Sequence, residues 1–405
     1  MQEQKGKIEA LCISAARGTV KHAVPEVTLV KGYGIEGDAH AGHWHRQVSL
    51  LSAEQVDAFN QRIASSNAQI LERTNLNKLD EIQRAKDEEL NTVEKAKFRE
   101  QNAFESDKIA ESGVTKKAVI EPAVAGTFGE NILVSGIDLR KLPVGSLLII
   151  KTANKELARN GNSNIPTLSA EFEEQKPTCD EQENAVILKL SQIGKECHSH
   201  CQIFQRVGDC IMPREGVFAT VEQGGVLTSG MEITVELPKA DAQLRAAVIT
   251  LSDKGSIGQR VDTAGPRATE LLAEAGYDIV EQVLLPDVQA KIERELKRLA
   301  DSRQVDLIIT TGGTGMAPRD VTPEATLAVA TRLVPGIAEA IRAGSLAITK
   351  RAMLSRGVSV LRNTTLIVNL PGSKKAVEEA LEIVLPTLEH GIRLAKGTDG
   401  ECGRT

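Results

Sequence analysis

Apolar and polar positions along the first half of the chain follow the pattern of short strands. Over residues 7–61, short apolar runs alternate with glycine-rich turns, as in VTLVKGYGIEGDAHAG, so we expect this part to be mostly β. The same signals return in GTFGENILVSGIDLRKLPVGSLLII, in VILKLSQIGKECHSHC and in GVFATVEQGGVLTSGMEITVEL. These runs predict one β-rich domain over residues 1–237.

Two polar segments interrupt that domain. Residues 62–118 are rich in Glu, Lys, Asn, Gln and Ala, with a sparse apolar stripe at Leu79, Ile82, Leu90 and Val93, which favours a solvated helix or helical hairpin without chemistry. Residues 151–184 are polar and lack periodicity, which indicates a long loop or a partly disordered insertion.

The pattern of the second half is different. After a linker at residues 238–244, the runs RAAVITLS, YDIVEQVLL and VDLIITTGGTG predict strands, and the helical stretches DTAGPRATELLAEAG and DVQAKIERELKRLADS alternate with them. Such alternation predicts a three-layer α/β domain with a mostly parallel sheet over residues 245–398, followed by a flexible tail at 399–405. In this architecture ligands bind beyond the carboxyl ends of the strands.

A further helix is expected in TPEATLAVATRLV. Thr322 is a good N-cap residue and Pro323 suits the first helical position. A glycine-rich turn, TTGGTGMAPRD, leads into this helix directly from a strand.

Composition narrows the class of protein. The formal net charge of −6 argues against a general nucleic-acid binder, and aromatic residues make up only 2% of the chain, too few for base-stacking platforms. The N-terminus lacks a charged start followed by an apolar run, and no stretch has eighteen consecutive apolar residues, so we expect a cytoplasmic protein without a membrane span. The six cysteines are too few for a disulfide scaffold, which favours metal ligands or reactive thiols where they cluster.

The stretch TTGGTGMAPRDVTPEAT carries the strongest chemical signal. Gly312, Gly313 and Gly315 can bring backbone N–H groups against an anion, and Thr311 and Thr314 add hydroxyl donors. The positive end of the following helix can face the same anion. The stretch is neither a Walker A loop nor a Gly-x-Gly-x-x-Gly turn, and a glycine turn after a strand is often only structural.

Three aspartates strengthen the prediction of a phosphate site. Asp253 and Asp287 follow the first two predicted strands, and Asp320 follows the glycine loop. We therefore expect these carboxylates to converge at one edge of the sheet, where carboxylates that face phosphates commonly hold Mg²⁺.

Residues 245–398 resemble the molybdopterin adenylyltransferase family, with SD, LPD, TTGGTG, PRDVTPEAT, LSR and NLPGS in the family's order. The resemblance implies a trimer that uses Mg-ATP to attach AMP to the terminal phosphate of molybdopterin and releases pyrophosphate. It implies phosphate binding by Thr311 to Gly315 and essential, metal-holding roles for Asp287 and Asp320. It also implies that the pterin or nucleotide pocket contains Ser252, Asp253, Ser355, Arg356, Pro371 and Gly372. The alternative is a domain that binds molybdopterin without turnover.

Histidines and thiols form two clusters in the first domain. GDAHAGHWHR contains Asp38, His40, His45 and Arg46, and ECHSHC contains Cys197. Three readings stay open: a zinc site, a reactive or cofactor-facing thiol beside an anion site, and buried inert cysteines.

These clusters, with FGENI, GIDLR, LPVG and GDCIMPREGVFA, resemble the MOSC domain, which is named after the C-terminal domain of molybdenum cofactor sulfurase. The resemblance implies a β-rich barrel that binds molybdenum cofactor and carries sulfur on a cysteine. Cys197 matches the family's cysteine best, and its neighbours Lys195 and His198 favour a thiolate. Cys201 is the second candidate, and Asp209 disfavours a thiolate at Cys210.

Together the two resemblances predict a protein of molybdenum cofactor biosynthesis. The expected ligands are molybdopterin, ATP and Mg²⁺ in the second domain and molybdenum cofactor in the first. Molybdenum-insertion proteins and molybdoenzymes are the expected partners, and joining two consecutive sites in one chain raises the local concentration of the intermediate. The alternative function is cofactor binding and delivery without catalysis.

Overall fold

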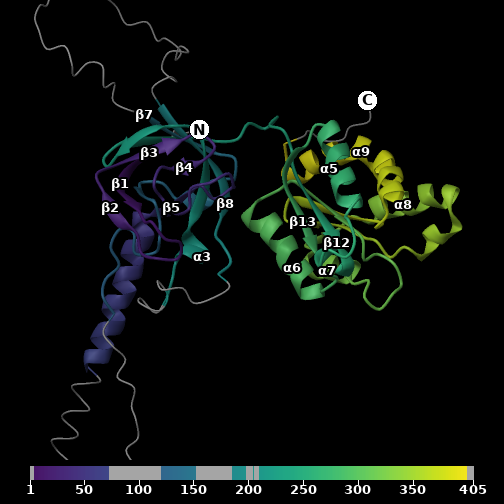
Figure 1. Cartoon of the computed structure of the whole chain (residues 1–405), viewed down its shortest axis with the longest axis horizontal. Coiled ribbons are helices and arrows are strands. Elements are labelled where there is room, and N and C mark those ends of the chain that lie inside the picture. Colours follow the sequence, from purple (N-terminus) through teal and green to yellow (C-terminus); the bar gives the residue numbers. More distant parts are fainter. Residues whose placement is uncertain (1–3, 73–119, 152–184, 198–203, 205–208, 399–405) are drawn as a thin grey trace, which may run out of the picture.

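The computed structural model describes residues 4–72, 120–151, 185–197, 204 and 209–398. Two bodies are visible in Figure 1, one purple to teal that ends near residue 237 and one green to yellow that starts at residue 245. Residues 237–244 between them carry neither helix nor strand. The insertion expected at 151–184 lies outside the described residues except for Lys151.

The first body is a closed β-barrel. The strand patterns predicted its β-rich character, and the barrel agrees with what the family resemblance implied. Its sheet runs in the order β11-β7-β8-β9-β5-β6-β1-β2, and a further β11–β1 pairing closes it. All of its strand pairs are antiparallel except β5 with β6. The strands are β1 (Lys5–Ile13), β2 (His22–Val24), β5 (Val48–Ser52), β6 (Ile132–Ser135), β7 (Leu147–Lys151), β8 (Ala185–Ile193), β9 (Val217–Gln223) and β11 (Glu232–Glu236).

A small second sheet and short helical turns complete this domain. The sheet has the order β10-β3-β4, with β3 (Glu26–Val30), β4 (Gly34–Ile35) and β10 (Gly225–Thr228). The turns are η1 (Leu139–Lys141) and α3 (Met212–Glu215). In β3 the alternating pattern of EVTLV places Val27 and Leu29 in the core and exposes the residues between them.

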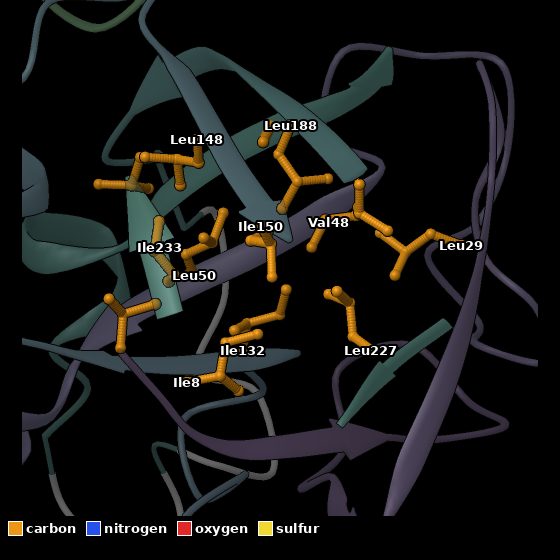
Figure 2. Close-up of a cluster of buried hydrophobic side chains, with 14 of the residues drawn as sticks. Ile8, Leu29, Val48, Leu50, Ile132, Leu148, Ile150, Leu188, Leu227 and Ile233 are labelled. Carbon is orange, nitrogen blue, oxygen red and sulfur yellow. The ribbon is translucent and has the colours of Figure 1, made fainter. Parts of the chain in front are cut away.

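Aliphatic side chains fill the interior of the barrel. Figure 2 shows Leu50, Ile132 and Ile150 pointing toward one another from different strands, and each is at most 1% exposed. Because the core contains aliphatic residues from strands all around the barrel, side chains pack its interior.

The helix of the first domain begins earlier than expected. Residues 53–72 are helical, so the helix begins nine residues before the expected start at residue 62, and residues 53–61 depart from the β pattern expected over residues 7–61. Val56, Phe59 and Ile63 are spaced three and four residues apart, and they pack with Phe128 and Met212 on the barrel. Those apolar positions form a helical stripe. It directly follows the apolar strand β5, so the change from strand to helix periodicity could not be located in the sequence. The remainder of the expected helical insertion lies outside the described residues.

The second body is a three-layer α/β domain, which confirms the predicted architecture. Its sheet runs β13-β12-β14-β17-β16-β15, in which the first four strands are parallel and the last two antiparallel. The strands are β12 (Arg245–Leu251), β13 (Asp278–Leu285), β14 (Leu307–Thr311), β15 (Arg332–Leu333), β16 (Ser359–Arg362) and β17 (Thr365–Leu370).

Helices cover both faces of this sheet (Figure 1). Val248 and Ile309 point to the face covered by α5, α8 and α9, and Ile249 and Ile308 point to the face covered by α6 and α7. The central strands are therefore buried on both sides, as continuous apolar runs predict. The helices and helical turns are α4 (Asp253–Ser256), α5 (Ala264–Glu274), α6 (Gln289–Lys297), η3 (Arg298–Ser302), α7 (Thr322–Val329), α8 (Pro335–Ile348), η4 (Lys350–Leu354) and α9 (Lys374–Lys396).

The start of α7 differs from the prediction. Val321 is its N-cap and Thr322 is already helical, and the Thr322 hydroxyl donates a hydrogen bond to Gly312 O at 2.9 Å. The helix also ends at Val329 and does not reach Val334, because Pro335 starts the next helix and favours an extended residue before it. Among the described residues, no helix has the length and apolar character to span a membrane.

Candidate active site and a second pocket

A cavity of about 250 Å³ lies at the carboxyl edge of the second domain's sheet. The loops after β12, β13, β14 and β17 all contribute to it, as the sequence predicts for a parallel sheet. Its lining comprises Thr250, Leu251, Ser252, Gly255, Arg260, Val261, Asp262, Thr263, Ala264, Asp287, Thr311, Gly312, Gly313, Asp320 and Gly372.

The glycine loop after β14 has a backbone that only glycine tolerates. Gly312 and Gly313 have φ angles of +101° and +62°. A Cβ on Gly312 would lie 2.4 Å from Leu251 O, and one on Gly313 would lie 2.3 Å from Thr322 Oγ1. The loop is therefore pressed against β12 and α7, and its backbone faces the cavity.

The hydroxyl of Thr311 has a structural partner. It donates to Pro371 O at 2.7 Å, which ties the end of β14 to the end of β17. Its proton is consequently not available to an anion, in contrast to the donor role that the sequence suggested. Thr314 is buried, and its carbonyl accepts a hydrogen bond from Arg356 N at 2.9 Å.

Asp287 and Asp253 are bound to each other's backbone. Asp253 N donates to Asp287 Oδ2 and Asp287 N donates to Asp253 Oδ1, each at 3.0 Å. The other oxygen of Asp287, Oδ1, is buried and has no hydrogen-bond partner among the described residues. Burial raises the pKa of Asp287, and the charges of Asp253 and Asp320 raise it further. A buried carboxylate oxygen without a donor fits a cation ligand.

Asp320 and Asp253 have different surroundings. Asp320 lines the cavity and accepts a hydrogen bond from Ala317 N at 2.9 Å. Asp253 instead accepts two hydrogen bonds from Arg319, at 2.9 and 2.7 Å, and this pairing lowers the pKa of Asp253. Arg319 therefore compensates the charge of Asp253. Asp287 and Asp320 line the cavity, together with Asp262 of the loop that precedes α5.

Several residues expected in this pocket lie behind it. Arg356 holds the glycine loop from outside, with Nε donating to Gly315 O at 2.6 Å and further hydrogen bonds to Asp320 O and the Glu324 carboxylate. The expected pocket residues that do not line the cavity are Asp253, Thr314, Gly315, Ser355, Arg356 and Pro371.

The loop between β12 and α5 contributes residues that sequence reasoning missed. Among the described residues that line the cavity, Arg260 is the only one with a cationic side chain, and Asp262 accepts hydrogen bonds from Ala264 N and Gly265 N at 3.0 Å. These residues could have been predicted from the position of the loop, which directly follows a strand at the ligand-binding edge of the sheet.

A second pocket, of about 340 Å³, lies in the first domain. Of the residues expected there, His40, Arg46 and Cys197 line it, and Asp38 and His45 do not. The full lining comprises Arg17, Gly18, Thr19, His40, Trp44, Arg46, Ser49, Phe128, Gly129, Lys195, Glu196, Cys197, Met212 and Phe218.

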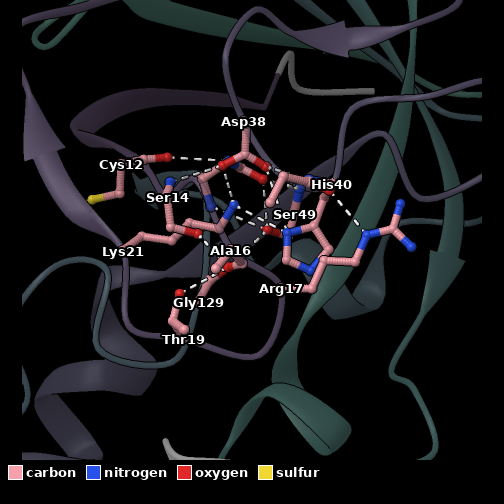
Figure 3. Close-up of polar contacts among 12 residues, drawn as sticks. Cys12, Ser14, Ala16, Arg17, Thr19, Lys21, Asp38, His40, Ser49 and Gly129 are labelled. Carbon is pink, nitrogen blue, oxygen red and sulfur yellow. Dashed lines mark hydrogen bonds and ion pairs between the residues drawn. The ribbon is translucent and has the colours of Figure 1, made fainter.

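A buried ion pair between Lys21 and Asp38 contacts His40. Lys21 Nζ lies 2.5 Å from Asp38 Oδ2, and both side chains are fully buried. Figure 3 shows the Lys21 amine pointing toward Asp38 and His40. Burial alone raises the pKa of Asp38, but hydrogen bonds from His40 and Lys21 outweigh it and hold that pKa below its usual range. Sequence reasoning missed Lys21, which no motif marks.

Arg46 and Trp44 form the basic wall of this pocket. The Arg46 guanidinium lies 4.8 Å and the Arg17 guanidinium 5.3 Å from the Trp44 ring centre. Arg46 Nε is buried without a hydrogen-bond partner among the described residues. With Lys195 also in the lining, the pocket is suited to an anionic ligand.

His45 faces away from the pocket. Its Nε2 lies 2.9 Å from Gln192 Oε1, and because Gln192 Nε2 donates to Gly194 O, the imidazole Nε2–H is the donor of this contact. Burial lowers the pKa of His45 to about 3, and the charges of Arg303 and Arg46 contribute to this shift. The ring is therefore neutral at physiological pH.

Cys197 is exposed at the pocket, whereas Cys12 and Cys210 are buried. Among the residues that the structure describes, no group of three or more His, Cys, Asp or Glu side chains is arranged to hold a metal ion. His198, His200 and Cys201 lie outside those residues, so the zinc reading of ECHSHC stays a prediction.

Comparison with known proteins relates the second domain to molybdopterin enzymes. Residues 247–390 match the family described as "Probable molybdopterin binding domain". The molybdopterin adenylyltransferase of Haemophilus influenzae is 46% identical over 158 residues, which cover 38% of this chain and 79% of that protein. The molybdopterin adenylyltransferase of Helicobacter pylori is 38% identical, with 38% of this chain and 89% of that protein covered.

A solved structure of the molybdopterin biosynthesis enzyme MoaB from Thermus thermophilus is 46% identical, covers 38% of this chain and 98% of that chain, and has a TM-score of 0.37. The family match contains no residue of the first domain. Relatives of this identity and coverage establish the family of residues 247–390, and the chain belongs through its second domain to the molybdopterin adenylyltransferase family.

Proposed function

We propose that this protein of molybdenum cofactor biosynthesis transfers AMP from Mg-ATP to the terminal phosphate of molybdopterin, with release of pyrophosphate. The observation that carries the proposal is the buried Oδ1 of Asp287, which has no hydrogen-bond partner in the part of the chain that the structure describes and lies against the glycine loop in the cavity at the sheet edge. A Cβ on Gly313 would be 2.9 Å from that oxygen, so the carboxylate and the loop backbone face the same small space.

Asp287 and Asp320 are the residues that would hold Mg²⁺. The donor set fits, because both are carboxylates in the lining, and burial together with the charges of Asp253 and Asp320 raises the pKa of Asp287, as expected where a cation would compensate the charge. When bound, the ion supplies charge neutralisation between the two phosphates that must approach each other.

The chain's own residues position the reactants. Gly312 N is already bound to Leu370 O at 3.2 Å, so the N–H groups from Gly313 onward are the candidates to hold a phosphate. The N-terminus of α7 points its partial positive charge toward the same loop, since Thr322 contacts Gly312. Arg260 adds a full positive charge at the opposite loop. These groups orient phosphates without forming a covalent intermediate.

For the first domain we propose a MOSC-like role, in which the pocket binds the maturing cofactor and Cys197 carries sulfur. The exposed thiol and the basic wall of Arg46, Arg17 and Lys195 support it. In such a step the Cys197 thiolate attacks the outer sulfur of a persulfide donor, a new S–S bond forms at Cys197, and the donor leaves as its thiolate. The reaction needs no external oxidant.

We also propose that the protein is a trimer in the cytoplasm, as the resemblance implies. Apolar side chains on the surface of the second domain support self-association: Leu346 and Ile348 on α8 and Met353 and Leu354 on η4 are 42–64% exposed. Light scattering of the purified protein measures its mass directly, and a monomer would contradict this part of the proposal.

Incubation of the full chain with molybdopterin, ATP and Mg²⁺ tests the catalytic proposal. We expect adenylylated molybdopterin and an equal amount of pyrophosphate. Asp320→Asn should lose turnover far more than molybdopterin binding, and Asp241→Asn, in the exposed linker, should retain both. Binding of molybdopterin by the unmodified protein with no pyrophosphate formed would favour the alternative, a binding and delivery protein.

A further inference from the structure

The segment that carries Cys197 leaves the barrel at a tightly fixed turn. Gly194, directly after β8, has a φ of +67°, and a Cβ there would lie 2.7 Å from Pro213 O. Gly194 N donates to Gly216 O at 2.7 Å, and Lys195 N donates to Pro213 O at 3.1 Å. The first domain thus holds this segment on one side.

The second domain holds the same segment on its other side. Arg303 Nη1 donates to Ser191 O at 2.7 Å, and Arg303 is only 3% exposed. Arg294 of α6 forms an ion pair with Glu196, the neighbour of Cys197, at 3.3 Å. Both contacts cross between domains, and they bracket the residues that lead to the thiol.

Arg303 is itself fixed by the second domain. Its carbonyl accepts a hydrogen bond from Arg245 Nη1 at 2.8 Å, and its Nε lies 3.5 Å from Glu281 Oε2 on β13. The next residue, Gln304, has a φ of +49°, and its side-chain oxygen accepts a hydrogen bond from Val144 N of the first domain at 2.8 Å. A non-glycine residue in the left-handed region costs free energy, and the interdomain hydrogen bond offsets part of that cost.

Arg303 also acts on the pocket through charge. Burial and the charges of Arg303 and Arg46 keep His45 neutral, so its ring can donate to Gln192 and is not repelled by the arginines. Gln192 in turn donates to Gly194 O at 2.7 Å. Arg303 binds Ser191 O and the adjacent Gln192 binds Gly194 O, so hydrogen bonds connect the second domain to the turn before Cys197.

We infer that the second domain positions the segment that brings Cys197 to the pocket, with Arg303 and Arg294 as positioning residues for residues 191–197. A role of this positioning in sulfur transfer rests on the proposed function of Cys197. The contacts themselves hold the segment whether or not the thiol carries sulfur. Because the linker at 238–244 is short, both arginines lie in the same chain as the pocket at a high local concentration.

Alkylation of Cys197 by iodoacetamide in the full-length protein tests the inference, with the modified peptide quantified by mass spectrometry over a range of pH. Arg294→Gln leaves Glu196 without its cation, and Arg303→Gln removes a buried positive charge from behind the pocket. Each change should raise the pH midpoint of alkylation by about half a unit or more, which slows the reaction roughly threefold at neutral pH.

Two further variants separate positioning from folding. Arg303→Lys retains the charge and should restore most of the midpoint. Arg267→Gln removes an arginine of α5 that pairs with Glu270 and Glu378, on the sheet face opposite to α6, and it should leave the midpoint unchanged. If Arg303→Gln does not fold, Arg294→Gln still decides the question, because its guanidinium is half exposed.

Unchanged midpoints in the folded glutamine variants would overturn the inference. Alkylation uses neither molybdopterin nor ATP, so failure of the adenylylation assay leaves this test unaffected, and the two proposals fail separately.

Discussion

Asp253 and Asp287 each accept a hydrogen bond from the other's backbone N–H, at 3.0 Å in both directions. This reciprocal pair joins the ends of β12 and β13, which are adjacent parallel strands. It fixes Asp287 so that Oδ2 is used within the protein and Oδ1 remains for the cavity. The pair therefore explains why LSD and LLPD both occur at strand ends, although only one of the two aspartates faces the cavity.

Asp287→Asn should abolish adenylyl transfer with little effect on the fold. The amide oxygen of Asn can still accept the hydrogen bond from Asp253 N, but the negative charge next to the glycine loop is lost. We expect pyrophosphate release to fall on the order of 100-fold or more. Asp253→Asn, whose carboxylate pairs with Arg319 outside the cavity, should lose much less. Equal losses in the two variants would remove the special role of Asp287.

Gly313→Ala should damage both stability and activity. The residue has a φ of +62°, and a methyl group would clash with Thr322 Oγ1 at 2.3 Å. We expect the free energy of unfolding to fall by about 1–3 kcal/mol in urea titrations. Gly336→Ala is the matched control, because it lies at the start of α8 with no atom near its missing Cβ, and it should be neutral or slightly stabilising.

Periodicity predicted the second domain well because each strand there is a continuous apolar run buried on both faces. Val248 and Ile249 show this directly, since consecutive residues enter different cores. The helix at residues 53–72 was placed too late, since Val56 and Phe59 directly follow a buried strand whose apolar residues mask the change of period. Helix starts depend on local hydrogen bonds. Thr322 was expected to be the N-cap of α7, but its hydroxyl donates to Gly312 O instead of capping the helix.

The site was predicted less completely than the fold. Strand ends located Asp287, Asp320 and the glycine loop, because topology alone brings the ends of parallel strands together. Whether the other expected residues line the cavity depends on the direction of their side chains, which the sequence does not give. Arg356 lies near the same sheet edge, but its side chain binds the glycine loop from outside the cavity. Lys21 in the first domain belongs to no sequence motif, and only the folded barrel places it beside Asp38, so it could not be predicted.

Glu130 should make the first domain less stable as the pH rises from 5 to 8. Burial raises the pKa of Glu130 from 4.5 to about 7, although Gly126 N and Phe128 N donate to its carboxylate. The folded state therefore binds a proton that the unfolded state has lost. Stability from this group is complete below pH 4.5 and disappears as the pH passes 7, a change of about 3 kcal/mol by linkage.

The measurement compares urea unfolding of the wild type and Glu130→Gln at several pH values. His45 has the opposite slope, since its pKa is lowered to about 3 and its stabilising effect is lost as the pH falls below 6.5. Both proteins share His45, so the difference between them isolates Glu130. A difference that does not change between pH 5 and 8 would show that Glu130 has an ordinary pKa in the folded protein.

Exposure to a persulfide donor should add one sulfur atom to Cys197 and none to Cys12. Cys197 is exposed at the basic pocket, whereas Cys12 is fully buried and its pKa is raised to about 12 by burial and by the charge of Glu130. A thiolate is the nucleophile in sulfur transfer, so Cys12 is a control within the same molecule. Mass spectrometry of the digested protein locates the added 32 Da, roughly the mass of one sulfur atom. Cys197→Ser should abolish the adduct, and stoichiometric zinc that is lost in the same variant would instead support the metal reading of ECHSHC.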